Sequence, residues 1–228
     1  MSAQNPLFPA FLKLENLRVL LVGGGNVGLE KLTAILRSSP NTAVTVVSIT
    51  FLAELLELAA RHPRIQLMER SWLETDLESA DIVFAATDDP ALHRRIKEAA
   101  RTRRLLVNVA DTPDLCDFYL SSVVQKGQLK VAISTNGKSP TVAKRVRAVL
   151  EETLPDELDD VLQQMTVIRG RLAGDFAAKV KSLNAVTAEL AGGRAYESPA
   201  TKRWRRVATG SLLAVGALLV GRLFRRPE

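Results

Sequence analysis

The sequence predicts an α/β fold in which a Rossmann-type domain with a parallel sheet is followed by a small hairpin region and a helical domain. Short apolar runs alternate with segments of helical periodicity over residues 17–111, and the first run ends in a glycine-rich loop. Beyond residue 113 two strand-like runs joined by a short turn replace this alternation. Strands that alternate with helices at this spacing form a parallel sheet with helices on both faces.

The five predicted strands are short apolar runs, too brief for helices. Runs of this kind are typical of strands that are buried on both faces of a parallel sheet. They lie in residues 17–22, 43–49, 64–70, 80–89 and 105–111. The predicted helices between them lie in residues 26–39, 51–62 and 90–104, and the last one opens at Pro90, where a helix tolerates proline.

The second half of the chain predicts a different architecture. Two strand-like runs within residues 117–135 meet at a turn around Lys126–Gln128, which indicates a hairpin. Helical periodicity then continues from Ser139 to about residue 190, with a break at Pro155. We therefore expect a Rossmann domain in residues 1–112, a hairpin region in 113–150, a helical domain in 151–200 and a separate tail in 201–228.

A glycine-rich loop follows the first predicted strand directly and precedes the first predicted helix. Gly23, Gly25 and Gly28 have the GxGxxG spacing of dinucleotide-binding loops. The first glycine permits a tight turn, the second lets a pyrophosphate approach the backbone, and the third allows close packing of helix on strand. The helix N-terminus adds free N–H groups and a partial positive charge. A dinucleotide site is therefore predicted, with a simple structural turn as the alternative.

The residues at the strand ends leave the identity of the dinucleotide open. The second strand ends in Ser48, Ile49 and Thr50, without the acidic residue that holds the ribose 2′-hydroxyl of NAD. No arginine stands there to bind the 2′-phosphate of NADP either. Thr87 ends the fourth strand, and like the following Asp88 and the later Asp111 it is expected to face the nicotinamide. For Asp89 we favour a capping role at the next helix.

Composition and charge exclude several classes of protein. The single cysteine, Cys116, cannot form an intramolecular disulfide, so we expect a reducing cytoplasmic compartment and interpret Cys116 as a small buried residue. The first residues lack the basic start and long apolar core of a signal peptide. The whole net charge of +6 lies within residues 201–228, so we expect no nucleic-acid binding by the folded domains.

Four motifs follow one another in the sequence: LVGGGNVGLEK, FAATDD, NVADTPDLCDF and VAISTNGKSPTVAKRVR. In this order and spacing they resemble the precorrin-2 dehydrogenase and sirohydrochlorin ferrochelatase family, the N-terminal part of siroheme synthases, over residues 7 to about 165. The resemblance implies a homodimer whose hairpin region, 113–150, mediates dimerisation. It also implies NAD as the cofactor and the oxidation of precorrin-2 to sirohydrochlorin, with ferrous iron as the substrate of a further insertion reaction in some members.

The resemblance assigns roles to individual residues. The aspartate of the family's NV.D.P motif falls on Asp111, which would act as the general base and take part in metal insertion. The alternative for Asp111 is a turn-forming role before Thr112 and Pro113. The family's cofactor contacts correspond here to Gly25, Asn26, Val27, Ser48 and Ile49. With His62 and His93 as the only histidines, no His/Cys cluster of metal ligands is expected.

Residues 118–150 contain six basic side chains and no acidic one, a composition that would attract a polycarboxylate such as precorrin-2. We interpret Lys126 and Lys130 as solvated residues balanced by the acidic run in 151–160. The segment STNGKSP opens a helix, and its polar residues are expected to bind the tetrapyrrole substrate. These residues are Ser134, Thr135, Asn136, Lys138 and Ser139. Thr135 also matches a family position that has been linked to phosphorylation.

Residues 207–221 form a run of 15 uncharged residues with basic flanks, shorter than the roughly 20 that a spanning helix needs. We expect this tail to attach the protein to the inner face of the cytoplasmic membrane, and leave open a helix docked on the dimer. The main rival to the enzymatic function is a membrane-tethered Rossmann module that senses NAD without turnover. A second rival is an NADP-dependent reductase of a smaller substrate.

Overall fold

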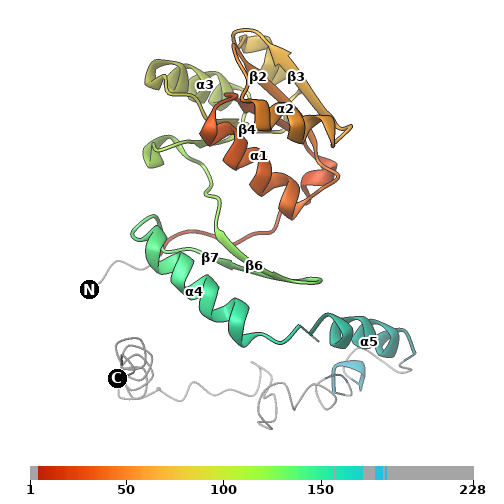
Figure 1. Cartoon of the computed structure of the whole chain (residues 1–228). Coiled ribbons are helices and arrows are strands. Elements are labelled where there is room, and N and C mark those ends of the chain that lie inside the picture. The colour runs from red at the N-terminus through yellow and green to blue at the C-terminus, as the bar shows by residue number, and fades with distance from the viewer. Residues whose placement is uncertain (1–4, 157, 172–177, 182, 184–228) are drawn as a thin grey trace, which may run out of the picture. The chain divides into compact units, whose positions relative to one another are not determined.

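Five parallel strands form the central sheet, in the order β3-β2-β1-β4-β5 (Figure 1). The computed structural model describes residues 5–156, 158–171, 178–181 and 183. The strands are β1 (Arg18–Val22), β2 (Ala43–Ser48), β3 (Ile65–Glu69), β4 (Ile82–Ala85) and β5 (Leu106–Val109). The order reverses between β1 and β4, the position at which open α/β sheets bind ligands beyond the carboxyl ends of their strands. The predicted Rossmann-type sheet is confirmed.

Helices cover both faces of this sheet and enclose two apolar cores. On one face, α1 (Asn26–Ser38) and α2 (Ala53–Ala60) bury Leu32 and Leu55 against alternate strand residues such as Leu21. On the other face, α3 (Pro90–Thr102) buries Ile96 against Leu20. Successive residues of β1 thus point to opposite cores, as the period of two in a strand requires. Sequence periodicity did not predict three short 3-10 helices in the described residues: η1 (Leu14–Asn16) before β1, η2 (Glu74–Ser79) between β3 and β4, and η3 (Pro113–Leu115) after β5.

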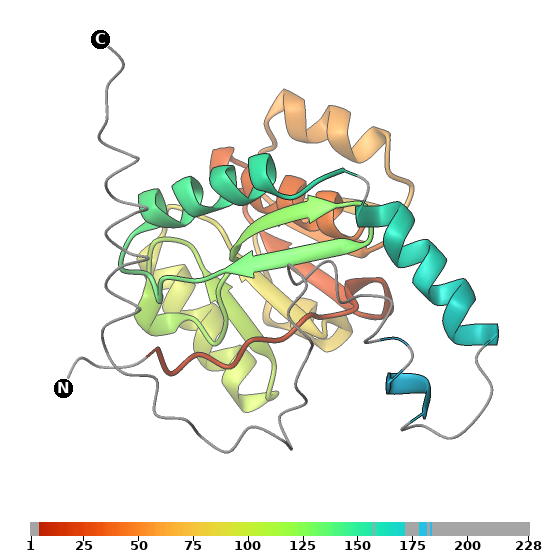
Figure 2. The ribbon, with the colours of Figure 1, turned by 90° about the horizontal axis from the view of Figure 1, so that it is seen from below.

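The predicted hairpin forms a separate two-stranded antiparallel sheet of β6 (Ser122–Lys126) and β7 (Leu129–Ile133). Helix α4 (Pro140–Thr153) packs against β6, and Figure 2 shows it running beside the two strands. Ser139 caps α4, because its hydroxyl accepts a hydrogen bond from the backbone N–H of Val142 at 3.2 Å. After the expected break near Pro155, α5 (Leu158–Arg171) begins a further helical region.

Our interpretation of Lys130 as a solvated side chain is wrong. Its Nζ donates a hydrogen bond to the backbone carbonyl of Ser38, the last residue of α1, at 2.6 Å. The last carbonyls of a helix lack intrahelical partners and carry partial negative charge, so they attract an ammonium group. Lys126 is also less solvated than expected, since its side chain is 20% exposed, but its partner Asp156 belongs to the acidic run that was expected to balance it.

The contacts divide the chain after Asp156. The finer division expected from the sequence, with boundaries near residues 112 and 150, stays a prediction. No helix in the described part of the chain is long and apolar enough to cross a membrane. The apolar run 207–221, with its expected membrane attachment, lies outside the described residues.

An ion pair joins the start of β1 to the segment before β4 and makes stability depend on acid pH. Asp81 accepts hydrogen bonds from the guanidinium and the backbone N–H of Arg18, at 2.7–3.0 Å. These bonds lower the pKa of Asp81 from 3.8 to about 2. A depressed pKa in the folded state stabilises the fold above pH 3.8, and this contribution disappears as pH falls through about 2.

We therefore expect Asp81→Asn to lower the Tm by a few degrees at pH 6, a small effect because the pair lies at the surface. Because protonated Asp81 resembles asparagine in charge, the difference in Tm between variant and wild type should shrink as pH falls from 4 toward 2. Thermal unfolding followed by circular dichroism across this pH range measures it. A Tm difference that stays constant down to the lowest pH at which the protein is folded contradicts the assignment.

Candidate functional site

Two glycines allow β1, the following loop and α1 to pack without space for side chains. Gly23 has a φ of +122°, and a Cβ built on it would lie 2.3 Å from the carbonyl oxygen of Ala86. A Cβ on Gly28 would lie 2.1 Å from the carbonyl oxygen of Gly23. Gly23 therefore has the positive φ of the predicted tight turn, and Gly28 allows the predicted close packing at the start of α1.

Gly25, the middle glycine of the motif, faces open space instead. A Cβ on this residue would meet nothing within 4 Å, and its φ of −85° suits any residue. Gly25 is also the N-cap of α1, so no side chain satisfies the first N–H groups of the helix, around Asn26 and Val27. Free N–H groups at a helix start, beside a backbone without a Cβ, fit a dinucleotide pyrophosphate.

The end of β2 holds the glycine loop and presents an exposed apolar residue beside it. The Ser48 hydroxyl accepts a hydrogen bond from the N–H of Gly24 at 2.9 Å, so this side chain supports the loop. The side chain of Ile49 is 69% exposed directly after the strand, where it is available to an adenine ring. Ser48 and Ile49 therefore lie beside the loop in different roles, one structural and one open to a ligand.

One arginine near this edge of the sheet is already engaged. Arg70 follows β3, and its backbone N–H donates to the carbonyl oxygen of Ser48 at 2.9 Å. Its guanidinium binds both carboxylate oxygens of Asp76, at 2.6 and 2.9 Å. Burial works to raise the pKa of Asp76, but hydrogen bonds from Arg70 and from the Leu73 N–H outweigh it, and the pKa is lowered. Arg70 could bind a 2′-phosphate only by giving up this partner.

The turn after β4 is held by Asp89 and Thr87. Asp89 caps α3, accepting hydrogen bonds from the N–H groups of Ala91 and Leu92 at 2.8 and 3.1 Å, which confirms the capping role. These two bonds lower the pKa of Asp89. The Thr87 hydroxyl accepts the Asp89 N–H at 3.4 Å and stays partly exposed at the strand end. The β4 strand stops at Ala85, four residues earlier than predicted, because residues 86–89 form this turn.

Asp111 lies just beyond β5 with its side chain exposed. It has a φ of +52°, a left-handed conformation that aspartate adopts more readily than most residues. In the sheet register, Val109 is level with Ala85, and Ala85 is level with Val22. Asp111 and the glycine loop therefore follow the same carboxyl edge of the sheet.

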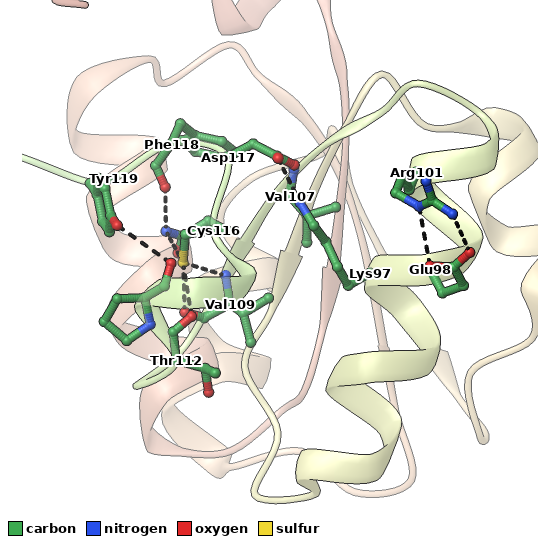
Figure 3. Close-up of polar contacts among 12 residues, drawn as sticks. Lys97, Glu98, Arg101, Val107, Val109, Thr112, Cys116, Asp117, Phe118 and Tyr119 are labelled. Atoms are coloured by element: carbon green, nitrogen blue, oxygen red, sulfur yellow. Dashed lines mark hydrogen bonds and ion pairs between the residues drawn. The ribbon is translucent and has the colours of Figure 1, made fainter. Parts of the chain in front are cut away.

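The loop that carries Asp111 is fixed by two side chains that follow it (Figure 3). The Cys116 sulfur contacts the N and the O of Val109, at 3.2 and 3.1 Å. Asp117 accepts a hydrogen bond from the Val107 N–H at 2.9 Å and pairs with Lys97 at 2.6 Å. These contacts agree with the interpretation of Cys116 as a structural residue. They also hold residues 116 and 117 beside β5.

Sequence reasoning assigned no role to three polar residues, Asn108, Lys31 and His93, that the structure buries at least in part. Asn108 is only 3% exposed, and its Oδ1 accepts a hydrogen bond from Lys31 Nζ at 2.9 Å. Burial lowers the pKa of Lys31. His93 is also buried, its pKa is lowered by burial, and its Nε2 has no partner in the part of the chain that the structure describes. The only sequence signal was that Lys31 and Asn108 lie within the motifs that carry the family resemblance.

Four of the five residues expected to bind the substrate line one pocket of about 180 Å³, together with Asn5. They are Ser134, Thr135, Asn136 and Lys138. The Thr135 hydroxyl also bonds the N–H and carbonyl of Ser139, each at 3.2 Å, which closes the loop onto the start of α4. The Ser139 hydroxyl caps α4. Its expected contact with the substrate stays a prediction.

Comparisons with known proteins agree with this geometry. A family model described as "Putative NAD(P)-binding" matches residues 10–122, and one described as "Sirohaem biosynthesis protein central" matches 126–153. A siroheme synthase of Methylococcus capsulatus is 35% identical over 92% of this chain and 47% of its own length. One of Salmonella schwarzengrund is 34% identical, over 74% and 36% respectively.

A solved structure titled "SirC, precorrin-2 dehydrogenase" matches with a TM-score of 0.66 and 26% identity, over 79% of this chain and 89% of that one. The chain belongs to the family of siroheme-synthase N-terminal regions. Its match spans about half or less of the length of the curated siroheme synthases.

The sheet edge and the pocket lie in different matched regions. The NAD(P)-binding match contains the glycine loop, the end of β2 and Asp111, and the central match contains the pocket residues 134–138. Together with the likeness to a precorrin-2 dehydrogenase, the first match supports NAD as the cofactor of this siroheme-synthase family member. Within the described residues, no group of three or more His, Cys, Asp or Glu side chains could hold a metal ion.

Proposed function

We propose that this protein oxidises precorrin-2 to sirohydrochlorin with NAD⁺. The observation that carries the proposal is the shared sheet edge, where the open Gly25 backbone at the start of α1 and the exposed carboxylate of Asp111 are both found. A cofactor cradle and a Brønsted base at one edge suit a reaction that removes a hydride and a proton. The likeness to siroheme synthases and to a precorrin-2 dehydrogenase supports the choice of substrate.

In the proposed reaction, one C–H bond of precorrin-2 delivers its electron pair and hydrogen to NAD⁺, which becomes NADH. The second hydrogen leaves as a proton, which the carboxylate of Asp111 accepts, and sirohydrochlorin is the product. The N–H groups at the start of α1 would hold the pyrophosphate, and Ile49 would contact the adenine. Lys138, in the pocket beside β7, would attract the substrate's carboxylates.

Incubation of the purified protein with precorrin-2 and NAD⁺ tests this function. We expect equimolar NADH and sirohydrochlorin, measured by their absorbance, and much slower turnover with NADP⁺. NAD binding without NADH formation would instead favour the sensor alternative. Adding ferrous iron to the same assay tests siroheme formation, in which Asp111 would accept pyrrole protons that the metal displaces.

We also propose that the protein is a homodimer formed through α4. Val142, Val146 and Val149 lie at helical spacing and are 51%, 40% and 41% exposed, whereas Ala143 faces β6 and is buried. Three exposed valines in one stripe indicate a surface that a protein partner covers. A second copy of the chain is the partner that the family resemblance implies.

We expect Val146→Asp to convert the dimer to a monomer, weakening association at least about 100-fold, because it buries an unpaired charge at the interface. Analytical ultracentrifugation measures the change, and circular dichroism checks that the helix persists. Thr141→Asp, exposed on the same helix outside the valine stripe, is the matched control and should remain dimeric. A monomeric wild-type protein would refute the interface.

A further inference from the structure

Lys31 projects from α1 toward β5 and is held in place by a fixed partner. Its Nζ donates to Asn108 Oδ1 at 2.9 Å. The amide of Asn108 has one orientation, because its Nδ2 donates to the backbone carbonyl of Phe118 at 2.9 Å. Phe118 in turn packs edge-on against Phe84, with 5.3 Å between the ring centroids. The ammonium group therefore lies at a defined position on the α1 side of the sheet.

The charge of Lys31 has no partner of opposite sign in the part of the chain that the structure describes. No carboxylate oxygen there lies within 4.0 Å of its Nζ. Burial lowers its pKa more than the carboxylates of Glu30 and Asp111 raise it. An ammonium has three N–H donors, of which Asn108 accepts one, so two donors and the positive charge remain available. A half-buried cation without a counterion is costly, which makes it a candidate for ligand binding.

Lys31 lies away from the expected cofactor phosphates and near the strand that leads to Asp111. Lys31 lies five residues beyond Asn26, which is about 7.5 Å further along the helix axis than the pyrophosphate cradle. Asn108, its partner, precedes Asp111 by three residues on the same strand and loop. Lys31 therefore lies beside the strand that leads to the expected base, where substrate rather than pyrophosphate would be bound.

We propose that Lys31 binds a carboxylate of the tetrapyrrole substrate and so orients the macrocycle against Asp111. The proposal rests on the proposed function, because a tetrapyrrole with a rim of carboxylates is the ligand that supplies the missing counterion. A single ammonium with two free donors matches one carboxylate group. The alternative is a structural role, in which Lys31 only donates a hydrogen bond to the buried Asn108 side chain.

Lys31→Gln tests the charge, because it removes the ammonium and keeps an N–H donor on the side chain. We expect its Kd for sirohydrochlorin, measured by absorbance titration, to rise about tenfold, the loss typical of one charged contact. The Kd for NADH, measured by fluorescence, and the Tm should stay near wild type. Arg37→Met, which removes an exposed charge from the same helix, should change none of the three. Lys31→Met, which removes the donor as well, provides a second variant.

Several outcomes overturn the proposal. Unchanged sirohydrochlorin affinity in Lys31→Gln excludes a carboxylate contact. Parallel losses of sirohydrochlorin affinity, NADH affinity and Tm, or failure of both Lys31 variants to fold, show a structural role only. Failure of the proposed function looks different, because the wild-type protein itself would then bind no sirohydrochlorin or form no NADH from precorrin-2.

Discussion

Asp111→Asn is expected to lower kcat/KM for precorrin-2 oxidation at least about 100-fold, because the amide cannot accept the proton that leaves the substrate. Asparagine is the suitable replacement, since Asp111 has a φ of +52° and asparagine also tolerates the left-handed region. The backbone turn is thereby retained, and alanine would strain it. NADH affinity and Tm should therefore stay close to wild type.

The measurement is the initial rate of NADH formation from precorrin-2, with the Kd for NADH from fluorescence. Asp114→Asn, which neutralises an exposed carboxylate in the same loop, is the matched control and should turn over normally. If Asp111→Asn retained the wild-type rate, Asp111 would have no part in proton removal. If both variants lost NADH binding, the effect would lie in the loop and not in the chemistry.

Gly25→Ala is expected to raise the Kd for NADH at least about 30-fold while leaving the Tm unchanged. The added methyl group meets nothing in the protein within 4 Å, and the φ of −85° suits alanine. It would, however, occupy the space beside the first N–H groups of α1, where the pyrophosphate is expected to contact the backbone. The variant therefore separates cofactor binding from folding.

Gly23→Ala provides the contrasting variant in the same loop. Its methyl group would lie 2.3 Å from the Ala86 carbonyl oxygen, on a backbone with a φ of +122°. We therefore expect a large decrease in Tm and a loss of NADH binding. Thermal unfolding and NADH fluorescence, run on both variants, distinguish the two roles. Normal NADH affinity in Gly25→Ala would place the pyrophosphate elsewhere and would leave the proposed chemistry without its cofactor site.

The sheet and the glycine loop could be predicted from the sequence because their signals are local. Apolar runs of strand length, and glycines at fixed spacing between a strand and a helix, encode their own backbone geometry. The packing of Gly28 against Gly23 and the capping role of Asp89 involve neighbours that are close in sequence, whereas Gly23 itself packs against the distant Ala86. The family motifs added the proposed role of Asp111 as general base, which residue chemistry alone left beside a turn-forming alternative.

The roles of two lysines could not be predicted, because their partners are distant in the sequence. Lys31 and Asn108 are separated by 77 residues, and Lys130 and Ser38 by 92. Composition suggested that Lys130 was solvated, since a basic stretch without acids carries no sign of a helix end elsewhere in the fold. The structural role of the Ser48 hydroxyl is of the same kind, because the Gly24 N–H that it accepts lies 24 residues away in the sequence.

The contact between Lys130 and the final carbonyl of α1 gives one helix two attachments. The N-terminal end of α1 opens onto the expected cofactor position, and its C-terminal end is bound by the hairpin. Each residue inserted into a helix turns everything beyond it by about 100°. A one-residue insertion in the middle of α1 would therefore rotate the Ser38 carbonyl away from Lys130 and break this hydrogen bond, whereas the same insertion in the turn between β6 and β7 would leave the Ser38 end of α1 unrotated.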